Sequence, residues 1–179
     1  MNRNIISRCR EYKGAIEYSN GTILEGTFSY GEPNGHCRII YLNGDYYEGN
    51  FINGKYEGEG RLEESNGTIY IGSWKNNNKQ GKGVEKMLDG STYTGEFIDG
   101  KRNGIGELTL LDGGTYVESF VNGVPEGKGL YMGSPPIRYK GDWKNGKKHG
   151  KGEMTFSDRN VYKGEFVENL MHGNGVLML

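Results

Sequence analysis

The stretch YEGNFINGKYEGEGRLEESNGTI, residues 47–69, decides the fold. Its pattern of tyrosine, glycine and aromatic residues returns every 23 residues, with no insertion between copies. The seven copies begin at Leu24, Tyr47, Tyr70, Tyr93, Tyr116, Tyr139 and Tyr162. A constant period in this range is typical of repeat proteins, in which each repeat packs on its neighbours.

Each copy contains two segments with the spacing of a β-strand. In the quoted copy, Tyr47 is followed by glycine after two residues and by Phe51 after two more, which places all three on one face of a strand. Further on, the glycine pair Gly58 and Gly60 precedes Leu62 with the same spacing. Glycine weakens a strand unless something approaches it closely. We expect the repeated aromatic rings to lie over these glycines.

Asn-Gly and Asp-Gly dipeptides separate the strands, as at Asn53-Gly54 and Asn66-Gly67. They supply the positive φ that tight hairpin turns require. The sequence therefore predicts an all-β fold, an elongated single-layer antiparallel meander of stacked 23-residue β-hairpin repeats. The low hydrophobic content, 34%, also argues against a thick two-layer core.

The pattern Y-x-G-x-F/W, followed by G-x-G and an Asn-Gly or Asp-Gly turn, resembles the MORN repeat (membrane occupation and recognition nexus) over nearly the whole chain. The resemblance implies a scaffold that joins proteins to each other or to a cytoskeletal or membrane-associated assembly. In similar proteins such arrays also precede a lipid-kinase or methyltransferase domain.

The chain divides into a polar N-terminal tail, residues 1–10, and a repeat array, residues 11–179. The array begins with a half unit at 11–23, and the full units start at 24, 47, 70, 93, 116, 139 and 162. The unit at 116 departs most from the pattern, because Glu118 replaces a glycine and a Ser-Pro-Pro run replaces the second turn. Since proline cannot donate to a ladder, we expect a bend or local break near 133–137.

Charge and composition exclude several classes of protein. A net charge of −1 argues against nucleic-acid binding by the whole molecule. No apolar run approaches the roughly 18 residues of a membrane span, and the N-terminus MNRNIISRCREYKG lacks the apolar core of a secretory signal. With only two cysteines there is no disulfide framework. These features predict a cytoplasmic protein.

The sequence predicts no catalytic residue, no cofactor site and no metal site, and hence no enzyme. His149 and His172 share a column but stand one repeat, roughly 10 Å, apart, too far for a shared zinc unless they lean together. A single-layer sheet also offers no water-excluding pocket. Glu85 stands in an apolar column. It marks either a site or, the interpretation we favour, a carboxylate that reaches solvent at the sheet margin or pairs with a lysine such as Lys82 or Lys86.

The densest basic segment is KNGKKHGK, residues 144–151, which includes Lys144, Lys147, Lys148 and Lys151. These are the candidate anion- or lipid-binding residues, since each lysine near an anionic membrane contributes on the order of 1 kcal/mol. The simpler alternative is that they are solvated loop lysines. The apolar residues Val176, Leu177, Met178 and Leu179 form a candidate edge for pairing with a second copy or another protein.

We therefore predict a non-catalytic scaffold for protein–protein assembly, associated with a membrane or a cytoskeletal structure. Its partners would be a protein or a second copy, bound through the terminal edge strands. Two alternatives stay open. One is peripheral binding of anionic phospholipid through the basic hairpin loops. The other is a targeting module of a larger lipid-kinase or methyltransferase assembly.

Overall fold

The computed structural model describes residues 10–134 and 137–179, which form fifteen strands and no helix. The all-β, repeated-hairpin fold predicted from the sequence is confirmed. The chain forms two compact units, one ending at Leu88 and one spanning Asp89–Leu179. The first unit holds β1 (Glu11–Glu17), β2 (Ile23–Ser29), β3 (Glu32–Ile40), β4 (Tyr46–Ile52), β5 (Lys55–Glu63), β6 (Ile69–Lys75) and β7 (Asn78–Lys86). The second holds β8 (Thr92–Ile98), β9 (Lys101–Thr109), β10 (Thr115–Val121), β11 (Val124–Gly133), β12 (Ile137–Lys144), β13 (Lys147–Thr155), β14 (Val161–Val167) and β15 (Leu170–Met178).

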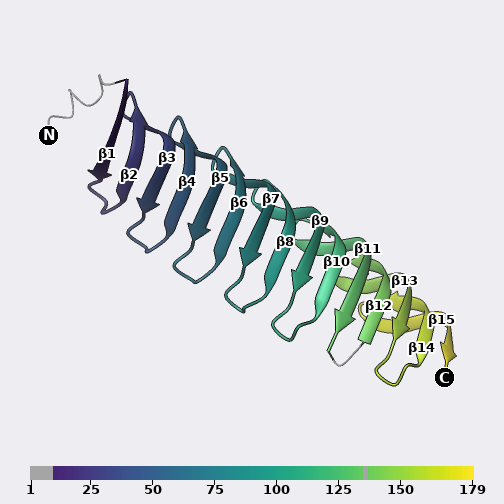
Figure 1. Ribbon diagram of the computed structural model, residues 1–179. Helices are drawn as coiled ribbons and strands as arrows, with labels where there is room; N and C mark the ends of the chain where they lie inside the picture. The colour runs from purple at the N-terminus through teal and green to yellow at the C-terminus, as the bar shows by residue number, and fades with distance from the viewer. Residues whose placement is uncertain (1–9, 135–136) are drawn as a thin grey trace. The chain divides into compact units, whose positions relative to one another are not determined.

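Within each unit every strand pairs antiparallel with its neighbours in the chain, and Figure 1 shows them side by side in that order. The predicted columns lie opposite one another, since Tyr47 pairs with Leu62 and Gly49 with Gly60. The half unit also keeps this register, because Gly14 pairs with Gly26. Residues 1–9 of the predicted tail, and residues 135–136 of the predicted break, lie outside the described residues. β11 ends at Gly133 and β12 begins at Ile137.

The hairpin turns inside the repeats have the predicted chemistry. Asn53 and Gly54 have φ angles of 49° and 74°, and both central residues of a type I′ turn need positive φ. The turns between repeats are different. At Tyr41–Gly44 the Gly44 amide donates to the Tyr41 carbonyl at 2.9 Å, and glycine alone has positive φ. That is a type I turn followed by a left-handed residue, the three-residue hairpin loop.

The two glycines of the G-x-G pair have separate structural roles. The first, such as Gly58 with a φ of 69°, adopts a left-handed conformation that favours glycine. The second lies beneath a tyrosine ring of its own repeat. A Cβ added to Gly152 would lie 2.5 Å from Tyr139 Cε2 and 2.7 Å from Tyr139 Cζ. The expectation that aromatic rings cover the glycines is thus confirmed for the second glycine, and the covering ring is the tyrosine.

Tyr139 illustrates how a tyrosine of this column is held, by one hydroxyl hydrogen bond and two edge-on ring contacts. Its hydroxyl donates to the Asp142 carbonyl at 2.9 Å. A β-bulge between Gly141 and Asp142 interrupts the ladder at this point. The ring meets Trp143 of its own repeat edge-on at 5.4 Å and Phe166 of the next repeat at 4.9 Å. Such edge contacts add to the stabilisation from burial, so the Tyr139 ring links two repeats.

Burial of these tyrosines makes the protein sensitive to alkali. It raises the pKa of Tyr116 and of Tyr139 to about 12, from 10.0 in the exposed phenol. The folded state therefore binds these protons more tightly than the unfolded state. Their stabilising effect is complete below pH 10 and is lost as the pH rises to about 12, by up to roughly 1.4 kcal/mol per tyrosine for each pH unit.

We expect phenolate absorbance at 295 nm to appear together with loss of the β-sheet circular dichroism signal as the pH rises from 10 to 12. Ionisation of all tyrosines near pH 10 with the sheet intact would contradict this assignment of the core.

Candidate interaction surfaces

The described residues hold no cluster of reactive side chains. Among them, no group of three or more His, Cys, Asp or Glu residues could hold a metal ion. Cys37 is buried and its thiol donates to the Thr27 carbonyl at 3.1 Å; burial raises the pKa of this thiol, which disfavours the reactive thiolate. Within residues 10–134 and 137–179 we find no helix capable of crossing a membrane.

The four candidate lysines of the basic segment do not form one surface. Lys144 and Lys147 lie opposite each other at the end of the β12–β13 hairpin, and Lys147 pairs with Glu168 at 2.9 Å. Lys148 points to the face of the sheet that carries the buried tyrosine column, here called the tyrosine face. Its Nζ lies 5.4 Å from the centroid of the Tyr139 ring. Burial there lowers the pKa of Lys148. Lys151 lies on the opposite face. Anion binding by this set stays a prediction.

Lys148 belongs to a column that crosses the tyrosine face, here called the bridge column. Its members are Pro33, Tyr56, Lys79, Arg102, Pro125, Lys148 and Met171. Lys79 lies 4.9 Å above the centroid of the Tyr70 ring and pairs with Glu85 at 2.6 Å. Glu85 is therefore paired on the inner face. The expected pairing with a lysine is confirmed, and the lysine is Lys79, which lies on β7 together with Glu85 and shares its face of the sheet.

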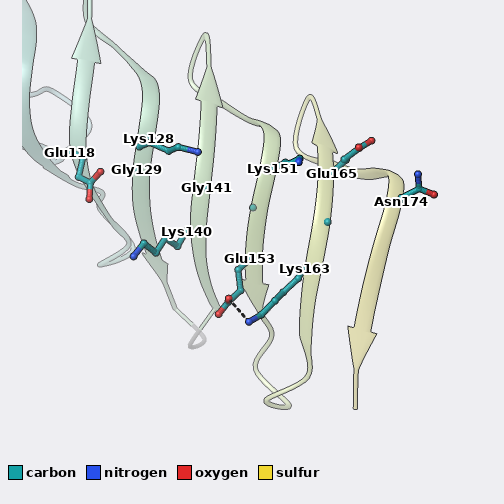
Figure 2. A pocket seen from close by; sticks show the side chains of 12 residues that line it. Glu118, Lys128, Gly129, Lys140, Gly141, Lys151, Glu153, Lys163, Glu165 and Asn174 are labelled. Atoms are coloured by element: carbon teal, nitrogen blue, oxygen red, sulfur yellow. Dashed lines mark ion pairs between the residues drawn. The ribbon is translucent and has the colours of Figure 1, made fainter.

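The opposite face of the second unit carries a groove of about 910 Å³ across β10–β15, the outer groove (Figure 2). Its floor is a row of consecutive cross-strand glycines, Gly129, Gly141, Gly152 and Gly164. Its cationic residues are Lys128, Lys140, Lys151 and Lys163. Its anionic residues are Glu118, Glu153 and Glu165, and Asn174 completes the lining. The outer groove thus combines a floor free of side chains with walls of both charge signs.

Part of the charge in the outer groove is neutralised internally. Lys163 pairs with Glu153 at 3.0 Å, as Figure 2 shows, and Lys128 pairs with Asp142. Among the described residues, Lys140, Lys151, Glu118 and Glu165 have no ion-pair partner. Two lysines and two glutamates are therefore free to meet a ligand.

Glu118 enters the outer groove at a conformational cost. The other six repeats have glycine at this position, and Glu118 adopts a φ of 122°, a region that L-residues rarely occupy. Strain of this kind costs on the order of 1–3 kcal/mol and is concentrated at functional sites. The strained backbone of Glu118 thus favours a binding role for the outer groove.

The first unit has a pocket of about 580 Å³ on its tyrosine face, the tyrosine pocket. The residues that define it are Tyr18, Glu32, Pro33, Tyr41, Phe51 and Tyr56. The Tyr41 and Tyr56 hydroxyls hydrogen-bond to each other across this face, and the Tyr56 ring stacks on Tyr47 with centroids 3.6 Å apart. Beyond Tyr41 the surface continues into a depression beside Asp45. The pocket is therefore aromatic, with Glu32 in its lining and Asp45 in the adjoining depression.

The candidate edge residues lie at the end of the chain. Val176, Leu177 and Met178 belong to β15, which pairs with β14, and Leu179 follows the strand. All four side chains are exposed. Pairing of this edge with another chain stays a prediction.

A chain with this repeated core and with variable residues on its open faces is a β-hairpin repeat protein. It belongs to the MORN-repeat family. The family model matches residues 25–46, 47–69, 70–92, 93–115, 119–134, 139–161 and 162–178. The fifth match begins directly after Glu118 and ends before the prolines at 135 and 136, where the sequence departs from the pattern. No curated protein matches the chain.

The chain is similar to two solved structures. The first is the SAS-4 (dCPAP) TCP domain of Drosophila melanogaster, in complex with a proline-rich motif of Ana2 (dSTIL). It is 15% identical, with a TM-score of 0.51 over 93% of this chain and 84% of that chain. The second is the wild-type TCP10 domain of Danio rerio CPAP, 10% identical, with a TM-score of 0.49 over 86% of this chain and 72% of that chain. At this identity the first similarity indicates the fold alone.

Proposed function

We propose that this protein is a protein-interaction scaffold and that the outer groove holds a segment of its partner. The observation that carries the proposal is the mixed charge of the groove. Lys140 lies opposite Glu153 in the register of β12 and β13, and Glu153 lies opposite Lys163 in the register of β13 and β14, so the signs alternate along the wall. A protein segment that carries both signs can complement such a wall.

The same charges disfavour a polyanion as the ligand. Phospholipid surfaces and nucleic acids are held by fields of one sign. In the outer groove three glutamates stand among four lysines, and these glutamates would repel a polyanion. The Drosophila TCP domain is likewise in complex with a protein segment, the Ana2 proline-rich motif, which is the class of interaction proposed here.

Selection of peptides from a random display library against the full chain tests the proposal. We expect selected peptides to carry acidic and basic residues, and to lose affinity by about tenfold or more when Lys140 and Lys151 are both replaced by alanine. The matched control is the Lys144→Ala, Lys147→Ala variant, which removes two exposed lysines outside the outer groove and should bind as the wild type does.

Co-sedimentation with neutral and phosphatidylserine-containing vesicles separates the lipid alternative. Protein that pellets with the anionic vesicles at physiological salt, together with no peptide sensitive to the Lys140 and Lys151 substitutions, would replace the proposal by lipid binding. Peptides that bind the groove variant and the wild type equally would place the interaction elsewhere on the chain.

Glu118→Gly should separate binding from stability. The change relieves the backbone strain at a φ of 122° while giving the unfolded chain more freedom, and we expect a net stabilisation of about 1 kcal/mol. It should also weaken any groove peptide whose basic residue contacts this carboxylate. Urea denaturation and peptide titration measure the two effects. A destabilised variant would show that the conformation of Glu118 is not strained.

A further inference from the structure

We propose that the tyrosine pocket binds the lysine or arginine side chain of an extended partner segment. The inference deepens the proposed function, because it takes a protein as the ligand and specifies its chemistry at a second site. The tyrosine pocket and the outer groove lie in different units and share no residue. Each can therefore be tested without the other.

The protein itself shows what this part of the tyrosine face accommodates. In three repeats the bridge column supplies a cation that lies over the tyrosine ring of its own repeat. Lys79 lies 4.9 Å from the Tyr70 centroid, and the Arg102 guanidinium carbon lies 5.6 Å from the Tyr93 centroid. Lys148 occupies the same position over Tyr139. A cation on this face, against an aromatic ring, is thus a repeated arrangement of the fold.

At the tyrosine pocket the chain supplies no such cation. Leu24 replaces the tyrosine of this repeat, so the aromatic surface comes instead from Tyr18, Tyr41 and Tyr56. The bridge-column residue here is Pro33, whose short ring cannot cross the face as Lys79 does. The next member, Tyr56, contributes an aromatic wall. The space left open, about 580 Å³, lies within the range of ligand sites in proteins.

The lining favours a cation over a neutral or acidic group. Tyr18, Tyr41 and Tyr56 supply π-faces and hydroxyl oxygens. Glu32 lines the pocket and Asp45 lines the depression that adjoins it. The described residues that line these two hollows include no lysine, arginine or histidine. A side chain with an aliphatic stem and a positive end matches both the aromatic walls and the carboxylates.

An extended segment is the form of partner that fits. The tyrosine pocket opens on a sheet face, and a side chain must leave a backbone to enter it. Chains flanked by proline hold an extended conformation without internal hydrogen bonds. The probes are therefore the peptides Gly-Pro-Arg-Pro-Gly and Gly-Pro-Lys-Pro-Gly, with blocked ends. Gly-Pro-Cit-Pro-Gly, in which citrulline is the neutral isostere of arginine, and Gly-Pro-Ala-Pro-Gly are the controls.

The experiment is an NMR titration of the full-length chain with each peptide up to millimolar concentration. We expect the arginine and lysine peptides to bind at least about tenfold more tightly than the citrulline and alanine peptides. Glu32→Gln should weaken the arginine peptide several-fold and leave the citrulline peptide unchanged. The Lys140→Ala, Lys151→Ala variant should bind as the wild type does, which separates this site from the outer groove.

Pro33→Lys is the sharper variant, because it supplies the bridge-column cation that other repeats have. We expect the added lysine to occupy the tyrosine pocket and reduce binding at least about tenfold. Pro125→Lys makes the same change at the equivalent position of the second unit and should leave binding intact. Thermal melts of both variants check that the fold is kept, and Glu32→Gln retains the test if Pro33→Lys does not fold.

Three outcomes would overturn the inference. The first is equal affinity for the arginine and citrulline peptides, and the second is binding to the alanine peptide alone, which would mark a site for proline. The third is no binding of any peptide to a folded wild-type chain. An empty result in the library selection against the outer groove would instead count against the proposed function and leave the tyrosine pocket supported by its own titration.

Discussion

Gly152→Ala lowers the free energy of unfolding by about 3 kcal/mol, a large effect for one added methyl group. The new Cβ would lie 2.5 Å from Tyr139 Cε2, and also 2.6 Å from the Tyr139 hydroxyl oxygen. The ring cannot yield, since it is fully buried and its hydroxyl is fixed on the Asp142 carbonyl. For a chain of 179 residues the loss corresponds to a fall of roughly 6–12 °C in Tm.

Gly14→Ala is the matched control. A Cβ at Gly14 would meet the Tyr12 ring at 3.7 Å, an ordinary contact, and no positive φ is required there. We expect this variant to melt within about 2 °C of the wild type. Hydrogen exchange should place the loss caused by Gly152→Ala in β12–β14, because repeats contact their neighbours and local openings stay local. Equal melting of the two variants would refute the close contact between the tyrosine ring and the second glycine.

Tyr93→Ala removes the ring at the centre of one repeat and is expected to cost roughly 2–4 kcal/mol. Tyr93 is fully buried. It meets Phe97 edge-on at 5.3 Å and Phe120 of the next repeat at 4.9 Å. The loss of the ring therefore weakens the link between two repeats as well as the packing inside one. Urea denaturation followed by circular dichroism measures the change.

Tyr93→Phe keeps the ring and removes the hydroxyl, which donates to the Glu96 carbonyl at 3.0 Å and lies 3.3 Å from the Asn103 carbonyl. We expect a loss of about 1 kcal/mol, since a carbonyl is left with fewer partners. The difference between the two variants measures the contribution of the ring itself. An unchanged melting curve for Tyr93→Ala would mean that the inner face has been assigned to the wrong side of the sheet.

Much of the fold was predictable because it depends on local spacing. A step of two residues assigns Tyr47, Gly49 and Phe51 to one face, and the Asn53-Gly54 dipeptide specifies the turn. The bulge after Gly49 was not predicted. The bulge leaves the Asn50 carbonyl available to accept a hydrogen bond from the Tyr47 hydroxyl, at 3.3 Å. A bulge is a feature of how two backbones pair, so no particular residue type in the sequence indicates it.

The candidate sites were less predictable, because they depend on how columns combine across strands. The sequence places Lys148 and Lys151 in one basic run, whereas strand alternation sends them to opposite faces. The outer groove needs side chains from six strands, β10–β15, so no single stretch shows it. One signal was available, namely Glu118 in a column of glycines. Its importance became clear from its backbone conformation.

The position of the tyrosine contacts also determines which length of sequence can be duplicated or deleted without loss of packing. The glycine beneath each ring, the carbonyl that accepts its hydroxyl and the first aromatic edge all lie within one hairpin, and the second edge comes from the following hairpin. Duplicating or deleting a block of 23 residues therefore restores every contact at the junction. An insertion of another length within a hairpin, between a tyrosine and its glycine, would shift the two out of register. Genes of this kind are expected to lengthen and shorten by whole repeats while the surface residues of each copy diverge.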